Sequence, residues 1–402
     1  MFKQVSKWVV VLGLLVVGIL SGYCYRTFVP KESLAYYYSR ITAQESVVGS
    51  IAITDAEWEH INKCKQTRGA LANKRTQDCL RDFYIEYTLT HGVRRSFSHL
   101  ALLQKESKSF VEDCHYVSHG IGHAQLQVNK GDIGKAFATM SEDAYFKNVS
   151  TCGNGYFHGV IEEYSKQTND KEMLVKILSN VCKEPGLKNA IDCFHGMGHA
   201  AFVQLEYATD DALYVCDNVT SDPVKNYSCY MGVFMEMAQD FATRDMVEVK
   251  DGRMTFKVCD SVDEKYKVAC YGQHSAFFEN FNLTPDDFTK NMRYCKQIEN
   301  DRYRMACVKF IAGRATRAVQ YEDVSGMCAE TSSPAERVMC TAVVATRIAY
   351  SIDRSRGNEL YIQALHDICK TLPFYRTYEC IDLVSHKSDK IYYDPNVMNG
   401  AM

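Results

Sequence analysis

The chain has 402 residues and a formal net charge of -3, with charged residues of both signs making up 24% of the sequence. This length allows two or three ordinary domains or one elongated repeat array. The charge balance offers no attraction for nucleic acid, and there is no basic arm, acidic tail or low-complexity block, so we expect an ordered protein without a nucleic-acid partner.

An apolar run from Trp8 to Leu20 follows Lys3 and Lys7 near the start of the chain. Because no small-x-small cleavage site follows, residues 1–25 are predicted to be an uncleaved signal anchor, a transmembrane segment that attaches the protein to a membrane. The lysines place the N-terminus in the cytoplasm, so the body of this single-pass protein is expected in the periplasm, outside the cell or in a lumen. A linker over 26–53, a repeat domain over 54–390 and a C-terminal tail over 391–402 complete the expected organisation.

Seventeen cysteines in an exported chain predict a disulfide framework. With Cys24 set aside, most of them form close pairs: Cys64 with Cys79, Cys182 with Cys193, Cys216 with Cys229, Cys259 with Cys270, Cys295 with Cys307, Cys328 with Cys340, and Cys369 with Cys380. The second member of each unit recurs every 33 to 41 residues, and Cys114 and Cys152 fall into the same series. Such a period is typical of helical repeats.

Helix-start signals agree with this period. Thr54 and Ser333 each precede an acidic residue by three positions, as in a capping box, and strand signals are nearly absent. We therefore predict an all-α fold, an α-solenoid of about nine two-helix repeats of 33–41 residues with a disulfide inside each repeat, preceded by the N-terminal transmembrane helix. The first cysteine of a pair ends helix A and the second lies in the first turns of helix B, for example in helices over 225–243 and 334–352.

Cys114 and Cys152 occupy the second-cysteine position in adjacent repeats that both lack a first one. We expect them to bridge each other across neighbouring B helices. The alternative is that one of them is a metal ligand, which would require a thiol to survive in an oxidising compartment.

The cysteine-paired helical units over residues 55–390 resemble the disulfide-stapled members of the tetratricopeptide-related helical repeats. The resemblance is architectural: the cysteine spacing here is wider, and the Trp, Gly and Tyr consensus of those repeats is missing. It implies stacked helix pairs with a concave face, which is a surface for a protein or peptide partner.

Histidines are concentrated on three successive B helices. The segment from Cys114 to Ala124 reads C-H-Y-V-S-H-G-I-G-H-A, and shorter copies occur at Phe157–Glu163 and Cys193–Ala200. Since i, i+4 side chains share one face of a helix, these imidazoles are predicted to converge on a mono- or dinuclear metal site. The predicted ligands are His115, His119, His123, His158, Glu162, His195 and His199.

The same motifs allow a second interpretation. Glycines at 120, 122, 159, 196 and 198 permit close approach of helices or of a ligand, and in this alternative the histidines are packing residues of a repeat consensus. Three copies in adjacent repeats favour a site over packing alone. His60, His91, His99 and His366 lie outside these repeats and are interpreted as structural or surface residues.

Imidazole ligands suit zinc, iron and copper alike, so a transition metal ion is expected without a choice among them. HEAT-repeat dinuclear iron hydroxylases are similar in drawing their ligands from stacked helices, but their His-Glu dipeptides are absent here and no residue role is transferred. Met231, Met235 and Met237 are interpreted as core residues, with a copper-binding surface as the alternative.

No nucleophile elbow, phosphate-binding loop or dinucleotide fingerprint is present. If the protein is an enzyme, we expect metal-dependent oxidation or hydrolysis with Glu162 or Glu163 as general base. Arg314 and Arg347 are candidate substrate-binding residues, because guanidinium groups bind carboxylates and phosphates. The alternative function is a non-enzymatic repeat scaffold that binds a protein or peptide in its concave face.

Overall fold

The computed structural model describes residues 52–65, 72–106, 109–142, 154–183, 190–239, 249–250, 253–254, 257–274, 285–315, 326–351 and 366–391. Residues 52–402 belong to one compact unit. The expected anchor over 1–25, nearly all of the linker over 26–53 and the tail beyond residue 391 lie outside the described residues. Within the described ranges, no helix combines the length and apolar character needed to cross a membrane.

The described chain is built of helices that alternate between two series. The first of each pair, helix A, is α3 (Asp55–Lys65), α5 (Val93–Glu106), α7 (Ile133–Glu142), α9 (Lys171–Val181), α11 (Thr209–Val219), α13 (Lys257–Ser261) and α15 (Pro285–Cys295). Helix B is α4 (Ala72–His91), α6 (Ser109–Val128), α8 (Gly155–Ser165), α10 (Ala190–Gln204), α12 (Pro223–Gln239), α14 (Glu264–His274), α16 (Asp301–Ala315), α18 (Pro334–Ser351) and α20 (Phe374–Ile391). The described strands are β1 (Val249–Lys250) and β2 (Arg253–Met254), a short antiparallel hairpin.

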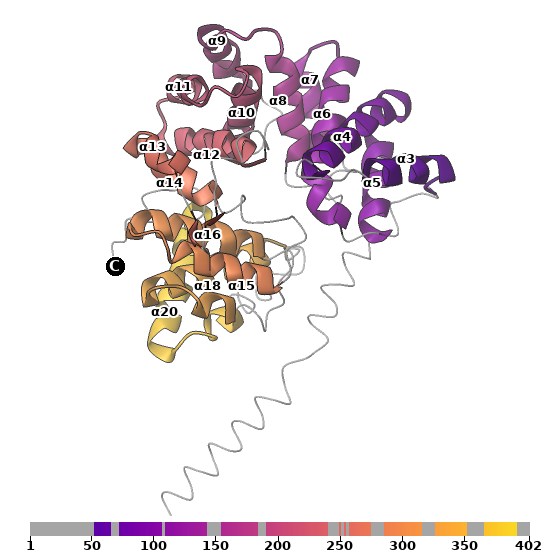
Figure 1. Ribbon diagram of the computed structural model, residues 1–402. Coiled ribbons are helices and arrows are strands. Elements are labelled where there is room, and N and C mark those ends of the chain that lie inside the picture. Colours follow the sequence, from indigo (N-terminus) through magenta and orange to yellow (C-terminus); the bar gives the residue numbers. More distant parts are fainter. Residues whose placement is uncertain are drawn as a thin grey trace, which may run out of the picture. The chain divides into compact units, whose positions relative to one another are not determined.

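Each B helix packs against the next B helix along the chain. Contacts run from α4 to α6, α8, α10, α12, α14, α16, α18 and α20 in that order. The A helices α3, α9, α11, α13 and α15 are each followed directly by the B helix to which the disulfide of that repeat connects them. Figure 1 shows the helices following one another in chain order. The predicted all-helical repeat architecture is confirmed in this form.

The predicted helix starts are also present. Thr54 and Glu57 form a reciprocal capping box, in which the Thr54 amide donates to Glu57 Oε2 at 2.6 Å and the Glu57 amide donates to Thr54 Oγ1 at 3.3 Å. The Glu336 amide donates to Ser333 Oγ at 3.2 Å at the start of α18. Such caps satisfy amides that the first helical turn leaves without an intrahelical partner.

Seven disulfides join the cysteine pairs expected from the spacing: 64–79, 182–193, 216–229, 259–270, 295–307, 328–340 and 369–380. Their Cα–Cα distances are 5.4 to 5.7 Å, well inside the range that a disulfide requires. In the chain-entropy treatment, closing loops of this length contributes about 3 kcal/mol each. The bridges therefore hold together two-helix units that are too small to form a core alone.

The predicted bridge between Cys114 and Cys152 is wrong, because Cys114 is a free, buried thiol. Cys152 itself lies outside the described residues. The within-repeat pairs are close because their cysteines lie on both sides of a tight A–B connection, and a bridge between repeats has no such connection to bring its cysteines together.

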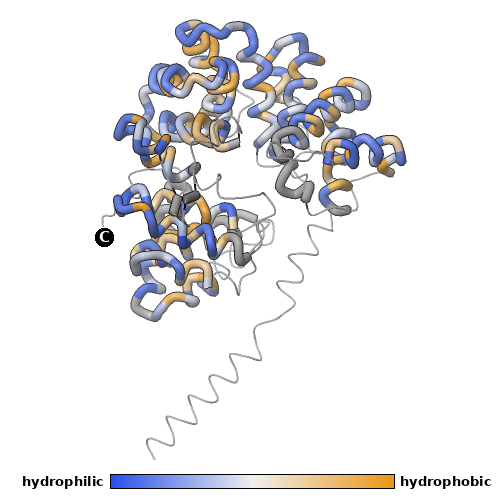
Figure 2. The backbone as a smooth tube through the Cα atoms, viewed as in Figure 1, coloured by the Kyte–Doolittle hydropathy of each residue, from blue (hydrophilic) through white to orange (hydrophobic). Residues whose placement is uncertain are grey.

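The core runs along the row of helices. Figure 2 shows that the helices carry both hydrophobic and hydrophilic residues, as expected for elements buried on one side. Tyr84, Phe97, Phe137, Tyr156 and Phe202 are among the largest fully buried side chains.

Glycines determine how closely the histidine-bearing helices approach. A Cβ atom at Gly122 of α6 would collide with the backbone of Tyr156 and Val160 in α8. One at Gly159 of α8 would collide with the backbone of His119, and one at Gly232 of α12 with that of His195. The glycines therefore serve helix packing, which confirms that part of the second interpretation. The close approach also brings the imidazoles of α6, α8 and α10 together.

Candidate metal centre

Five imidazoles from three helices form one cluster. His115 and His119 come from α6, His158 from α8, and His195 and His199 from α10. Each pair on one helix is separated by four residues and thus lies on one face. The structure therefore brings together five of the six predicted histidine ligands.

The rings of His115, His119, His158 and His199 all neighbour one another. Their six centroid distances range from 5.0 Å, between His115 and His158, to 6.4 Å, between His115 and His199. Four mutually adjacent rings describe a tetrahedron. His195 lies on one side of it, 4.8 Å from His199 and 5.3 Å from His158.

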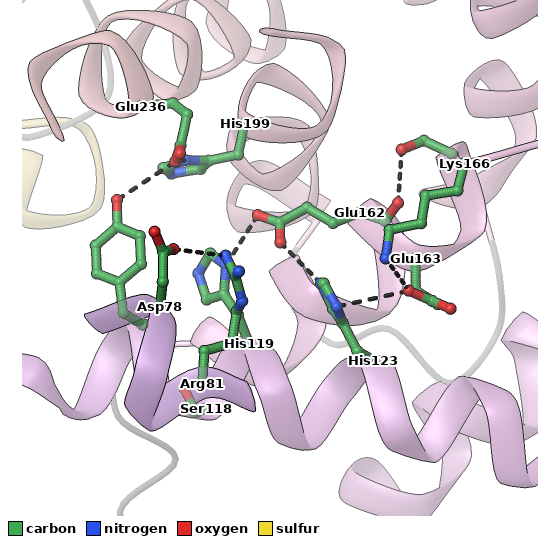
Figure 3. A network of polar contacts seen from close by, with 12 residues as sticks. Asp78, Arg81, Ser118, His119, His123, Glu162, Glu163, Lys166, His199 and Glu236 are labelled. Carbon is green, nitrogen blue, oxygen red and sulfur yellow. Dashed lines mark hydrogen bonds and ion pairs between the residues drawn. The ribbon is translucent and has the colours of Figure 1, made fainter. Parts of the chain in front are cut away.

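Two carboxylates orient these rings from outside the cluster. His119 Nδ1 lies 2.8 Å from Glu162 Oε1, and His199 Nδ1 lies 2.7 Å from Glu236 Oε2. An ionised carboxylate only accepts hydrogen bonds, so each Nδ1 donates to its carboxylate and Nε2 is the ring nitrogen left to face the cluster. Figure 3 shows both carboxylates beside their imidazoles. This is the arrangement by which carboxylates position metal-binding histidines.

Glu162 also contacts His123, whose Nε2 lies 3.0 Å from Glu162 Oε2. Burial by itself would raise the pKa of Glu162, but the charges and hydrogen bonds of His119 and His123 hold that pKa well below its usual value. Glu162 is therefore a carboxylate that joins two imidazoles. With both oxygens engaged, it is not free to serve as a general base in this arrangement.

His158 is the centre of the cluster. Its side chain is 2% exposed, and neither of its ring nitrogens has a hydrogen-bond partner among the described residues. His119 Nε2 likewise has none there. Burial, followed by the nearby His115 and His199 rings, lowers the pKa of His158 well below its ordinary value. The ring is therefore neutral, and its available lone pair points into a group of other imidazoles.

Two groups of ligand atoms are close enough for one ion. Nitrogens of His115, His158 and His199 lie within 4.8 Å of one another, and so do ligand atoms of Glu162, His199 and Glu236. A third such group, His60 with Cys64 and Cys79, contains two cysteines that are joined in a disulfide and offer no thiolate.

Two predicted site residues, His123 and Glu163, take other places. His123 lies apart from the ring cluster and contacts Glu162 and Glu163, the latter at 3.5 Å. Glu163 pairs with the exposed Lys166 at 2.6 Å, as drawn in Figure 3, and accepts a hydrogen bond from Gln127. Glu163 is thus turned away from the imidazole cluster, which removes the geometric support for its predicted role as general base.

The two candidate substrate-binding arginines belong to α16 and α18, which carry none of the five clustered imidazoles. Arg314, in the last turn of α16, lies over the Phe310 ring at 5.5 Å, and its charge opposes the rise in the pKa of Tyr116 that burial and the carboxylates cause. The backbone of Arg347 is in α18, and its side chain lies outside the described residues. Their proposed substrate role stays a prediction.

Two residues that complete the site were not among the predicted ligands. Glu236 of α12 is 6% exposed and holds His199, and Tyr116 donates to Glu236 Oε2 at 3.3 Å from 120 positions earlier in the chain. The Tyr116 ring stacks on His119 at 5.1 Å. The position of Glu236 could have been noticed in the sequence, because it directly follows Met235, which is equivalent to a histidine of the preceding B helices. No local pattern in the sequence links Tyr116 to Glu236.

Arg81 of α4 adds a positive charge at the edge of the site. It pairs with Asp78 at 3.2 Å, and its side chain is 32% exposed. Burial opposes its charge, but Asp78 and the two site carboxylates outweigh that effect and raise its pKa. Arg81 is thus one guanidinium among the carboxyl groups of Asp78, Glu162 and Glu236.

The outlying histidines include one that is fully buried. A hydrogen bond of 2.8 Å joins His99 Nδ1 to Tyr84 Oη, and His99 Nε2 lies 3.7 Å from Glu57 Oε2. The rings of Phe83 and Tyr87 also neighbour it. This environment agrees with the structural role expected for His99.

No protein-family model, curated protein or solved structure matches the chain.

Proposed function

We propose that this protein is a helical-repeat metalloprotein in which imidazoles of α6, α8 and α10 bind a transition metal ion. The observation that carries the proposal is His158, a buried imidazole with both nitrogens unpartnered among the described residues and with four other imidazoles around it. Buried polar atoms are normally hydrogen-bonded, and an unpaired one costs roughly 1–3 kcal/mol. A bound metal ion compensates for this cost.

The ring geometry supports coordination by nitrogen. With metal–nitrogen bonds of about 2.0 Å, four imidazoles around a tetrahedral ion have ring centres roughly 5 Å apart. The observed centroid distances of 5.0 to 6.4 Å are close to this value. Ligating nitrogens in such a site are about 3.3 Å apart, so the nitrogens of His115, His158 and His199, within 4.8 Å of one another, need only small rotations to close on an ion.

The packing interpretation accounts for less of the geometry. Close approach of α6, α8 and α10 needs the glycines, and it does not need histidine beside them. A histidine retained for packing would be expected to hydrogen-bond across the interface. His119 and His199 do so through Nδ1 alone, and both keep Nε2 turned toward other imidazoles.

We infer that three histidines, His115, His158 and His199, are the primary ligands and that His119 is the fourth candidate. Three protein ligands with one open position are typical of catalytic metal sites, whereas four close the site. Metal-dependent oxidation or hydrolysis requires the three-ligand arrangement, because a substrate or water must occupy the open position. Glu162 and Glu236 then orient ligands and compensate charge, and a metal-bound water would be activated by the ion itself.

We further propose that the repeats form an α-solenoid held on the non-cytoplasmic side of a membrane by residues 1–25. The seven disulfides support an oxidising compartment, and the unbroken order of contacts between successive B helices supports a solenoid. Tyr116 of α6 bonding Glu236 of α12, across the two intervening B helices, supports a strongly curved inner face.

Elemental analysis of the purified protein tests the metal proposal. The wild-type chain, expressed in metal-replete medium and purified without chelators, is expected to contain about one transition metal ion per chain. His158→Ala should lose it while retaining helical content, and His91→Ala, at an exposed histidine outside the cluster, should keep it. A folded wild-type protein that contains no metal and takes up none on titration would overturn the proposal.

A further inference from the structure

A second group of ligand atoms lies beside the imidazole cluster, between α10 and α12. His195 Nε2 is 3.1 Å from His199 Nε2 and 3.3 Å from the Sδ atom of Met235. His195 and Met235 are partly exposed, whereas His199 is fully buried. Two imidazole nitrogens and one thioether sulfur thus meet at the border between the surface and the buried cluster.

The other contacts of these side chains fix which ring nitrogens face the group. His199 Nδ1 lies 2.7 Å from Glu236 Oε2, so Nε2 is the nitrogen directed at His195. The His195 ring also hydrogen-bonds to the Ser228 backbone, and its Nε2 faces both His199 and Met235. Imidazole nitrogen and thioether sulfur are both metal ligands, so a cation bound at His195 has a second nitrogen and a sulfur within reach.

The spacing fits a cation bound by all three. For metal–nitrogen bonds of about 2.0 Å and metal–sulfur bonds of about 2.3 Å, the ligand atoms of a tetrahedral site lie roughly 3.3–3.5 Å apart. The separations from His195 Nε2 to the other two atoms, 3.1 and 3.3 Å, are close to that range. Both contacts of His195 therefore match the spacing of atoms that share one ion.

Met235 differs from the other methionines of α12. Met231 is 4% exposed and Met237 is 1% exposed, so both are core residues, as expected from the sequence. Met235 is partly exposed, and its sulfur faces an imidazole. Thioether sulfur is a soft ligand that selects copper(I) over zinc(II), which prefers imidazole, thiolate and carboxylate.

We propose that His195, His199 and Met235 form a copper(I) site at the rim of the imidazole cluster. This inference rests on the proposed metal-binding function, because His199 belongs to both groups of ligands. Copper(I) bound at the rim lies next to His158, whose ring centre is 5.2 Å from that of His199. His199 can therefore hold the ion first with His195 and Met235 and then with the inner imidazoles, which makes the rim the position at which copper is taken up.

The test is an anaerobic titration of the full-length protein with copper(I) in competition with a chromogenic copper(I) chelator. Met235→Leu removes the sulfur and keeps an apolar side chain of similar size, and it should weaken copper(I) binding by roughly tenfold or more. Met237→Leu, a matched change in the core of the same helix, should leave the affinity unchanged. X-ray absorption of the copper-loaded wild type should contain a sulfur neighbour at about 2.3 Å that is missing from Met235→Leu.

Zinc(II) titration of the same variants separates this inference from the proposed function. Met235→Leu should bind zinc as the wild type does, because thioether sulfur contributes little to a zinc site. A wild type that binds zinc, with equal copper(I) affinity in both methionine variants or with no sulfur neighbour at copper, overturns the rim site and leaves the metalloprotein standing. A protein that binds neither metal overturns both.

Discussion

Replacing Gly159 by alanine is expected to separate α6 from α8 and to open the imidazole cluster. A Cβ at this position would lie 2.6 Å from the Cα atom of His119 and closer still to its carbonyl oxygen. Since the obstacle is backbone, it cannot move aside as a flexible side chain would. Overpacking costs about 1–3 kcal/mol, and a collision with backbone belongs at the upper end of that range. The better helix propensity of alanine returns about 1 kcal/mol, so we expect a net loss of about 2 kcal/mol.

Gly272 of α14 provides a matched control. A Cβ there would have its nearest neighbour, the carbonyl oxygen of Ala306, at 3.7 Å, which is an ordinary contact. Gly272→Ala should therefore be neutral or more stable by up to about 1 kcal/mol.

Hydrogen exchange followed by mass spectrometry measures both variants repeat by repeat, which suits an array whose units need not unfold together. Gly159→Ala should accelerate exchange in α6 and α8 and lower the metal content, whereas Gly272→Ala should do neither. Equal protection of α6 and α8 in the two variants would refute the role assigned to the glycine contact.

Two further predictions concern a carboxylate and a buried imidazole. Glu236→Gln should reduce metal affinity by roughly 10–100-fold without unfolding the protein, because a neutral amide orients the His199 ring less well and makes it a weaker ligand. Glu172→Gln, on the exposed face of α9, should leave the metal affinity unchanged. Equal metal affinities of the two variants in a competition titration would contradict the role of Glu236. Burial lowers the pKa of His99 to about 4, although the charge of Glu57 acts to raise it. The unfolded chain takes up a proton at this histidine below about pH 6.5, whereas the folded protein does not until the pH is much lower. The contribution of His99 is thus complete above that pH and is lost as pH falls, by about 2 kcal/mol between pH 7 and pH 5. Urea unfolding of the metal-free protein at these two pH values should show the loss, and His99→Gln should reduce it; an unchanged pH dependence in the variant would exclude His99 as its source.

The disulfide pairs were predictable because each closes a short loop between neighbouring helices. A separation of 11 to 15 residues leaves few ways to connect the ends of two packed helices, so sequence distance and spatial distance agree. The Cys114–Cys152 prediction failed where this agreement ended, since a bridge between repeats depends on the distance between helices and not on the spacing along the chain.

The histidines were predictable as a face and not as a set of contacts. Their i, i+4 spacing placed His115 and His119 on one side of α6, because that spacing is a property of any helix. It did not distinguish His119, which faces the cluster, from His123, which lies beyond Glu162. One more helical turn carries the side chain past the neighbouring helix, and only the position of α8 decides on which side of Glu162 it falls.

By itself, then, the amino-acid sequence determined the helical repeats, their disulfides and the helices that carry the histidines, because all of these follow from periods and loops of a few tens of residues. The tertiary structure decided which atoms meet. Tyr116 reaches Glu236 across 120 positions, and Met235 leaves the core to face His195, 40 positions before it. These contacts depend on how far each repeat is rotated against the next, and that rotation is set by backbone contacts at the glycines, which no local pattern in the sequence specifies.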